Sequence, residues 1–227
     1  MTLATVDPER DRAWHLAERE RMANQEYLAP FLAPLTITDG SVLVDIGCGG
    51  GYINSFVAAR HRMSLNIGLD LDPQTMRLAR DLNRQAQSVH WLCASAEALS
   101  LQSGSVDFLV CRGVVPLARV HRVLSEIGRI MKPGARAVIL LHSWSFYLRW
   151  LSLHPRRWKR SAAGLLHFAL GVWFNLTGQQ LRVRWRGRPI GQTFQTEFRM
   201  RRLLRRYGLE LERAVQRPEF VVYARKA

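Results

Sequence analysis

VLVDIGCGGG at residues 42–51 is the stretch that decides the fold of this 227-residue chain. Its first half is a mostly apolar run that predicts a buried β-strand, and the glycines after it predict a tight turn. From Gly51 to about Arg60 the apolar residues recur at helical spacing. The first N–H groups of a helix have no partner within the helix, so this strand, turn and helix together predict a ligand-binding loop.

An acid at the end of the next predicted strand supports a nucleoside ligand. SLNIGLD at 64–70 repeats the strand pattern and ends in Asp70, nineteen residues after Gly51. A carboxylate there can accept hydrogen bonds from both hydroxyls of a ribose. A GxGxxG dinucleotide turn would require glycine at its sixth place, which is Tyr52 when counted from Gly47. The pattern therefore points away from NAD.

Strand and helix patterns alternate outward from this centre. Five strands are predicted, at 41–47, 64–70, 88–94, 105–111 and 135–142. This alternation predicts a doubly wound α/β fold, in which a parallel sheet is covered by helices on both faces and binds ligands at the carboxyl ends of its strands. The helix before the fifth strand is expected to stop at Lys132-Pro133-Gly134, which is a turn signal.

The two ends of the chain differ from this alternation. A helix is expected from Asp7, its capping residue, to about Leu32. A second helix is expected over 192–208, ended by Gly208. Two strands follow, LELERAVQ and EFVVYAR, joined by a turn at Arg217-Pro218. These two strands predict an antiparallel hairpin that closes the sheet.

The successive segments resemble the motifs of the class I S-adenosylmethionine-dependent methyltransferases, in order and spacing. The segments that carry the resemblance are VLVDIGCGGG, NIGLDLDPQTMRLAR, CASAEAL, SVDFLVCRGVV and LSEIGRIMKPGARAVIL. They are most similar to the small-molecule branch with the ubiquinone/menaquinone-type, methyltransferase type 11-like enzymes. The resemblance implies a Rossmann-like seven-stranded sheet, mostly parallel with an antiparallel C-terminal strand. It implies a single domain, with a helical cap (1–40), a cofactor-binding core (41–142), a helical lid insertion (143–191) and a C-terminal helix and hairpin (192–227).

The resemblance also implies the cofactor, S-adenosyl-L-methionine, and the residues that hold it. They are Asp45, Gly47, Cys48, Gly49, Gly51, Asp70, Leu71, Ser95, Ala96 and Arg112. Ser95 stands where the family usually has an acid. The Asn/Asp-Pro-Pro-Tyr signature of enzymes that methylate amide or exocyclic amino groups is replaced by CRGVVP. The three cysteines lack metal-ligand spacing, so we expect no metal, and Cys93 and Cys111 are expected to be core thiols that suit a reducing cytoplasm.

Charge is distributed unevenly along the chain. The formal net charge is +15, of which residues 1–142 contribute 15 basic and 14 acidic side chains and residues 143–227 contribute 18 and 4. Residues 143–191 hold nine basic residues, no acid and five of the seven tryptophans. A neutral front and a basic back suggest that the back meets something anionic.

Three interpretations compete for residues 143–191, beside simple packing. The first is a lid whose aromatic residues wrap an apolar acceptor, with Trp144, Phe146, Tyr147, Phe168, Trp173 and Phe174 as candidates. The second is an in-plane contact with an anionic membrane surface. The third is nucleic-acid binding. We favour the first two over RNA, because residues 1–142 are neutral.

Together these features predict methyl transfer to a hydrophobic small-molecule acceptor, such as a natural product, a quinone or a lipid-like molecule, by in-line displacement. His142 at the end of the fifth strand is the candidate base, with Tyr27 and His121 as weaker ones. An RNA methyltransferase and a non-catalytic cofactor-binding relative remain the alternatives. The polar N-terminus and the lack of a long apolar run predict a cytoplasmic protein, peripheral at the membrane. The acceptor atom and the oligomeric state stay open.

Overall fold

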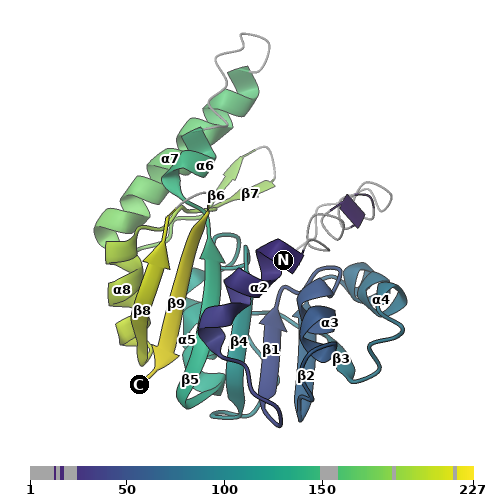
Figure 1. The fold of residues 1–227 in the computed structure, drawn as a ribbon. Helices are drawn as coiled ribbons and strands as arrows, with labels where there is room; N and C mark the ends of the chain where they lie inside the picture. The colour runs from purple at the N-terminus through teal and green to yellow at the C-terminus, as the bar shows by residue number, and fades with distance from the viewer. Residues whose placement is uncertain (1–12, 14–15, 18–24, 149–157, 186–187, 217–218) are drawn as a thin grey trace.

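The computed structural model describes residues 13, 16–17, 25–148, 158–185, 188–216 and 219–227. A seven-stranded sheet lies at its centre (Figure 1), with the strand order β3-β2-β1-β4-β5-β9-β8. Its strands are β1 (Val42–Ile46), β2 (Leu65–Asp70), β3 (Val89–Cys93), β4 (Val106–Arg112), β5 (Met131–Leu141), β8 (Leu209–Val215) and β9 (Phe220–Lys226). Only β9 runs against the others, pairing antiparallel with both β5 and β8. The predicted sheet is confirmed.

Helices cover both faces of this sheet because side chains alternate in direction along each strand. On one face, α2 (Gln25–Leu32) and α3 (Tyr52–Ala58) pack over Leu43 of β1. On the other face, α5 (Val120–Ile130) and α8 (Glu197–Arg206) pack over its neighbour Val44. Helix α4 (Pro73–Leu82) follows β2 and is capped by Asp72, whose carboxylate accepts from the backbone N–H groups of Gln74 and Thr75.

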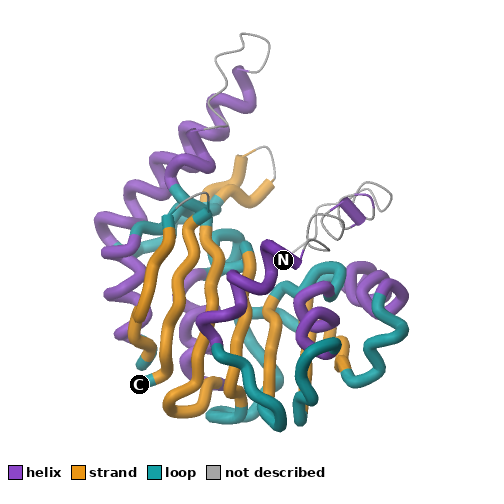
Figure 2. Tube along the Cα trace, in the orientation of Figure 1, coloured by secondary structure: helices purple, strands orange, loops and turns teal. Residues whose placement is uncertain are grey.

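The described parts of residues 143–191 form two helices and a small ribbon. Helix α6 (Trp144–Leu148) follows β5, and α7 (Trp158–Thr177) is the longer helix of this segment. Strands β6 (Val183–Trp185) and β7 (Arg188–Ile190) pair antiparallel outside the main sheet. Figure 2 shows that α7 begins well beyond the carboxyl edge of the sheet and runs back toward α8. No helix within the described ranges is both long and apolar enough to cross a membrane.

Two element boundaries differ from expectation. Strand β5 begins at Met131, so Lys132-Pro133-Gly134 lies inside it; Met131 pairs with Val106 and Arg136 with Phe108, and this irregular register absorbs the extra residues. Helix α8 begins at Glu197 instead of Gln192, because the Thr196 hydroxyl accepts from the Arg199 N–H and caps the helix there.

The remaining predictions on the chain ends and the cysteines had mixed outcomes. Helix α2 confirms the C-terminal part of the predicted first helix, whereas Asp7 and the turn Arg217-Pro218 lie outside the described residues. Cys111 is buried in the central strand β4, as expected. The prediction for Cys93 is wrong, since its side chain is exposed. Strand β3 is an edge strand, where one flank of the strand has no neighbour to cover it.

Candidate functional site

The carboxyl ends of four neighbouring strands bring the predicted residues together. Ile46 of β1 pairs with Leu69 of β2 and with Cys111 of β4, so Asp70 and Arg112 end their strands on either side of the turn that begins at Gly47. Leu140 of β5 pairs with Arg112, which places His142 just beyond this row. One edge of the sheet therefore gathers groups that are far apart in sequence, as parallel packing requires.

The turn after β1 depends on glycine. Gly47 has φ +74°, and a Cβ atom there would lie 2.1 Å from Cγ2 of Val114. The N–H groups of Gly47 and Cys48 both donate to the carbonyl of Leu69, at 2.7 and 3.0 Å. Gly51 caps α3 in a left-handed conformation. These contacts tie the loop to β2 and direct the N-terminus of α3 toward the ends of the strands.

Asp45 lies buried below this loop and is not hydrogen-bonded. Neither carboxylate oxygen has a hydrogen-bond partner. Burial raises the pKa of Asp45 to about 7, with Arg112 opposing the shift and Asp70 adding to it. A buried carboxylate without donors is costly. Its position fits a cationic ligand that supplies the missing interaction.

Asp70 holds the loop and the start of the next connection at once. One carboxylate oxygen accepts from the N–H of Asp72 at 3.1 Å, and the other from the N–H of Gly49 at 3.4 Å. Because Asp70 is only partly buried, a ligand at this edge could reach its carboxylate. Leu71 beside it is 38% exposed, which leaves an apolar side chain open at the same edge.

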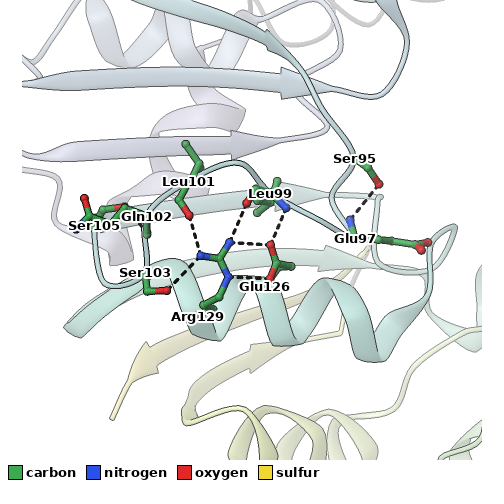
Figure 3. Close-up of polar contacts among 9 residues, drawn as sticks. All are labelled: Ser95, Glu97, Leu99, Leu101, Gln102, Ser103, Ser105, Glu126 and Arg129. Carbon is green, nitrogen blue, oxygen red and sulfur yellow. Dashed lines mark hydrogen bonds and ion pairs between the residues drawn. The ribbon is translucent and has the colours of Figure 1, made fainter.

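Ser95 and Ala96 lie in the connection between β3 and β4, which is anchored from below. The Ser95 hydroxyl accepts from the N–H of Glu97 at 3.2 Å. Figure 3 shows how Arg129 of α5 holds the rest of this connection. Its guanidinium donates to the carbonyls of Leu99 and Leu101, at 2.9 and 2.7 Å. The loop that carries Ser95 is thus fixed by hydrogen bonds to a helix.

Arg112 and Tyr27 each form a hydrogen bond near this edge, and only part of these contacts was predicted from the sequence. The guanidinium of Arg112 donates to the Tyr52 hydroxyl at 3.3 Å. Tyr27 of α2 donates to the carboxylate of Glu219 at 2.7 Å, across 192 residues of sequence. Burial, followed by the hydrogen bond to Glu219, raises the pKa of Tyr27, so its phenol stays protonated. Glu219 directly precedes β9, and no sequence signal marked it except its position beside the hairpin turn.

His142 lies at the end of β5 among aromatic and uncharged groups. Its ring stacks on Phe146, with 4.3 Å between centroids. Burial lowers the pKa of His142 to about 4, and the neighbouring His167 of α7 lowers it further. His142 is therefore neutral at pH 7. His167 was not among the residues predicted from the sequence; it is buried in the insertion and close enough to His142 to influence the pKa of His142.

The aromatic candidates of the insertion separate into different environments. Phe146 lies against His142, and Phe168 packs against Phe194 at 5.5 Å. Trp144 is half exposed. Phe174 is fully buried in the main core, and Trp173 is exposed on the face of α7 away from His167. Helical periodicity sets these directions. The side chain of Tyr147 lies outside the described residues.

His121, the other weak candidate, is held by hydrogen bonds between helices. Its ring bonds the Tyr207 hydroxyl and the Gly178 carbonyl, at 2.9 and 2.8 Å. It therefore bridges α5, α7 and α8. Cys48 contributes its backbone to the glycine loop, while its thiol is buried beside Met76 and Ala79.

One observation of the structure, the buried Asp45 carboxylate without hydrogen bonds, supports a fit between the residues at this edge and S-adenosylmethionine. That molecule carries two cationic groups, an ammonium and a sulfonium, and Asp45 presents a buried carboxylate with both oxygens unpaired. Asp70 and the open side chain of Leu71 offer the acceptor and the apolar contact that a nucleoside requires.

Comparisons with known proteins agree on the family of the core. Residues 44–139 match the family described as "Methyltransferase domain". A malonyl-[acyl-carrier protein] O-methyltransferase of a Marinomonas species is 30% identical over 134 residues, covering 54% of this chain and 50% of that protein. The ubiquinone/menaquinone biosynthesis C-methyltransferase UbiE of Rubrivivax gelatinosus is 31% identical over 139 residues, covering 59% and 50%. The chain thus spans about half the length of these curated relatives.

Solved structures support the fold across nearly the whole chain. A methyltransferase in complex with the Trm112 activator, from Haloferax volcanii, matches with a TM-score of 0.68 at 17% identity, covering 95% of this chain and 97% of that one. A SAM-dependent methyltransferase from Aquifex aeolicus matches with a TM-score of 0.63 at 16% identity, covering 98% and 100%. At these identities the likeness establishes the fold.

Proposed function

We propose that this chain, whose residues 44–139 match a methyltransferase domain, is a class I S-adenosylmethionine-dependent methyltransferase. We propose further that it methylates a hydrophobic small-molecule acceptor, such as a natural product, a quinone or a lipid-like molecule. The observation that carries the donor half of the proposal is the buried, unpaired carboxylate of Asp45 beneath the glycine loop. The acceptor half rests on the neutral, aromatic surroundings of His142.

When bound, S-adenosylmethionine supplies a methyl group on a sulfonium, whose neutral thioether product is a good leaving group. Asp45 and the loop from Gly47 to Gly51 would hold its amino-acid end, Asp70 its ribose, and Leu71 with the loop at Ser95 its adenine. None of these residues needs to transfer a proton. Their contribution is to fix the methyl group in line with an incoming nucleophile.

On the acceptor side, His142 is the residue we propose to take a proton. Its ring is neutral at pH 7 and stacked on Phe146, so the nitrogen can accept from a hydroxyl or phenol. His167 faces it without adding a negative charge. A site of this kind binds an apolar acceptor more readily than a charged one. The name of the UbiE relative places that protein in ubiquinone and menaquinone biosynthesis, which agrees with such an acceptor.

The proposed apolar acceptor also leads to a proposal for where the protein acts in the cell. We place the protein in the cytoplasm, peripheral at a membrane, because an apolar acceptor partitions into lipid. The alternatives, an RNA methyltransferase and a non-catalytic relative, predict other results in the experiment below.

Calorimetry with S-adenosylmethionine tests the donor half. Asp70→Ala is expected to weaken binding by about 10-fold to 100-fold, because a hydrogen bond to a charged group contributes about 1.5–3 kcal/mol. Asp81→Ala, which removes an exposed acid of α4 paired with Arg84, is the matched control and should bind like the wild type. Equal affinity of the Asp70 variant would contradict the proposed site.

Methyl transfer from labelled cofactor tests the acceptor half. Phenols and quinols with alkyl chains of increasing length are expected to give rising kcat/KM, as burial of each methylene contributes about 0.8 kcal/mol. Labelling of RNA instead of these acceptors would refute the proposal in favour of the nucleic-acid alternative. Cofactor binding with no transfer to any acceptor would favour the non-catalytic relative.

A further inference from the structure

Helix α7 exposes an apolar face to solvent. Leu176 is 76% exposed and Leu165 57%, and Val172 and Trp173 are exposed beside them. These four residues, which we call the exposed stripe, lie within about 100° of one another around the helix axis. The opposite face is buried and carries His167, Leu170 and Phe174. A contiguous apolar surface of this kind marks an interaction site.

A cavity rich in arginine lies at the C-terminal end of this helix. It has a volume of about 660 Å³ and lies between the end of α7, the start of α5 and α8. Its lining includes His121, Thr177, Gly178, Arg199, Arg202 and Arg206, and no described acid lines it. We call it the arginine cavity. Thr177 directly follows Leu176, so the cavity begins next to the last residue of the exposed stripe.

Arg199 makes the charge of this cavity unusual. It is only 8% exposed, and its Nε donates to the carbonyl of Asn175 at 3.0 Å. Burial, and then the neighbouring Arg202, lower its pKa. Among the described residues, no acid forms an ion pair with Arg199, Arg202 or Arg206. Buried charges are normally paired, so an anion in the cavity would supply a missing partner.

We propose that the exposed stripe and the arginine cavity together form a docking surface for an anionic phospholipid bilayer. The stripe enters the boundary between headgroups and acyl chains, and the cavity receives a lipid phosphate. Tryptophan and arginine suit this boundary because each has an apolar body and a polar end. Phe198, which is 65% exposed beneath the guanidinium of Arg202, extends the apolar surface onto α8.

Two other occupants fit the surface less well. A second copy of the chain, joined by two-fold symmetry, would bring the unpaired arginines of α8 close to their equivalents. Like charges facing each other oppose association. RNA would match the arginines, but three of the four side chains of the exposed stripe are aliphatic, so the stripe gives bases little surface for stacking. A bilayer satisfies both the charge and the apolar area.

The docking surface and the acceptor site share one helix. His167 on the buried face of α7 lies beside His142, while Trp173 on the exposed face belongs to the stripe. An acceptor dissolved in lipid would therefore have a short path to the site. This part of the inference rests on the proposed function, whereas docking itself does not.

Vesicle flotation without methyl donor or acceptor tests docking separately from catalysis. The wild type is expected to bind phosphatidylcholine vesicles that contain phosphatidylglycerol, and to bind pure phosphatidylcholine weakly. Arg202→Gln/Arg206→Gln should lower the affinity for these vesicles about 30-fold, because each arginine near an anionic surface contributes about 1 kcal/mol to binding. Trp173→Gln/Leu176→Gln should lower it about 10-fold or more. All four substituted residues are exposed, and circular dichroism verifies folding.

Arg77→Gln/Arg80→Gln on α4 is the matched control, because both residues are exposed and the charge change is the same. It should bind vesicles like the wild type. The proposal is overturned if this control loses as much vesicle affinity as the Arg202/Arg206 variant, or if Trp173→Gln/Leu176→Gln loses none. Either result would mean that binding is an unspecific attraction between opposite charges. Binding of inorganic phosphate or of RNA without binding of vesicles would also overturn the proposal.

Discussion

At the scale of single residues, Asp45 couples stability to ligand binding. Its carboxylate is buried with both oxygens unpaired, and burial raises its pKa to about 7. The folded protein thus holds an unfavourable charge at neutral pH, which a cationic ligand would compensate. Such poorly satisfied groups are typical of binding sites, where local stability is sacrificed for affinity.

Asp45→Asn is expected to stabilise the protein without ligand in a pH-dependent manner. Since the pKa of the folded state lies above the ordinary value of 3.8, the folded state binds the extra proton. The contribution of this group to the free energy of unfolding therefore falls as the pH rises from about 4 to about 7. Urea denaturation should show that the variant gains about 2–3 kcal/mol on the wild type between pH 5 and pH 8.

Asp81→Asn controls for loss of a negative charge, because Asp81 is exposed. It should show no such pH-dependent gain. The Asp45 variant should also bind S-adenosylmethionine less tightly. A stability difference between wild type and Asp45→Asn that stays constant with pH would disprove the assignment of a raised pKa.

His142 gives a second prediction, on the pH dependence of catalysis. Because burial holds its pKa near 4, the ring is neutral throughout the physiological range. With saturating cofactor, kcat should stay flat from pH 7 to about pH 5.5 and show no loss near 6.5, the ordinary pKa of histidine. His142→Phe should lower kcat by about 10²-fold to 10⁴-fold.

The separate effects of His142→Phe on kcat and on KM distinguish a catalytic base from a residue that only packs against Phe146. Loss of packing against Phe146 would raise KM for the acceptor and leave kcat nearly unchanged. If the phenylalanine variant keeps its full kcat, transfer needs no base at this position.

At the scale of elements, hydrogen bonds to side chains of a helix hold one connection between strands in place. The segment between β3 and β4 is fixed by Arg129 and Glu126 of α5 (Figure 3). Arg129 binds both oxygens of Glu126 at 2.8 Å, and Glu126 accepts from the N–H of Leu99 at 2.6 Å. The hydrogen bond from Arg129 lowers the pKa of Glu126. The loop at Ser95 is therefore preorganised.

Arg129→Gln should destabilise the protein by about 2–3 kcal/mol, because it leaves two backbone carbonyls and a carboxylate without their donor. The loss should diminish as the pH falls through the lowered pKa of Glu126, where the carboxylate becomes protonated. Thermal or urea unfolding measures both effects. Arg84→Gln, which breaks the exposed pair with Asp81, should change stability by less than about 0.5 kcal/mol. Equal effects of the two substitutions would contradict this role.

At the scale of the whole molecule, the two halves of the sheet take different tasks. The half with β1, β2 and β3 carries the glycine loop, Asp70 and Ser95, and the half with β5, β9 and β8 carries His142 and the insertion (Figure 1). The basic last third of the sequence folds against the second half. The uneven charge along the sequence thus becomes an uneven charge in space. The nearly neutral cofactor region lies in one half of the molecule, and the basic helices α7 and α8 lie in the other.

The sequence by itself determined the elements whose signals are local. The run from Val42 to Gly51 and the alternating strands are set by neighbours within a few residues, and the structure confirms them. Asp70 reaches the glycine loop because parallel strands in register align their ends. These features required no knowledge of distant contacts.

Only the tertiary structure decided which distant groups meet and which faces remain exposed. Tyr27 meets Glu219 across 192 residues, and His167 faces His142 from a separate helix. Cys93 is exposed because its strand lies at an edge, while Trp173 and Phe174, neighbours in sequence, point to solvent and core. The physical reason is that local periodicity fixes the type of an element, whereas burial depends on what packs against it.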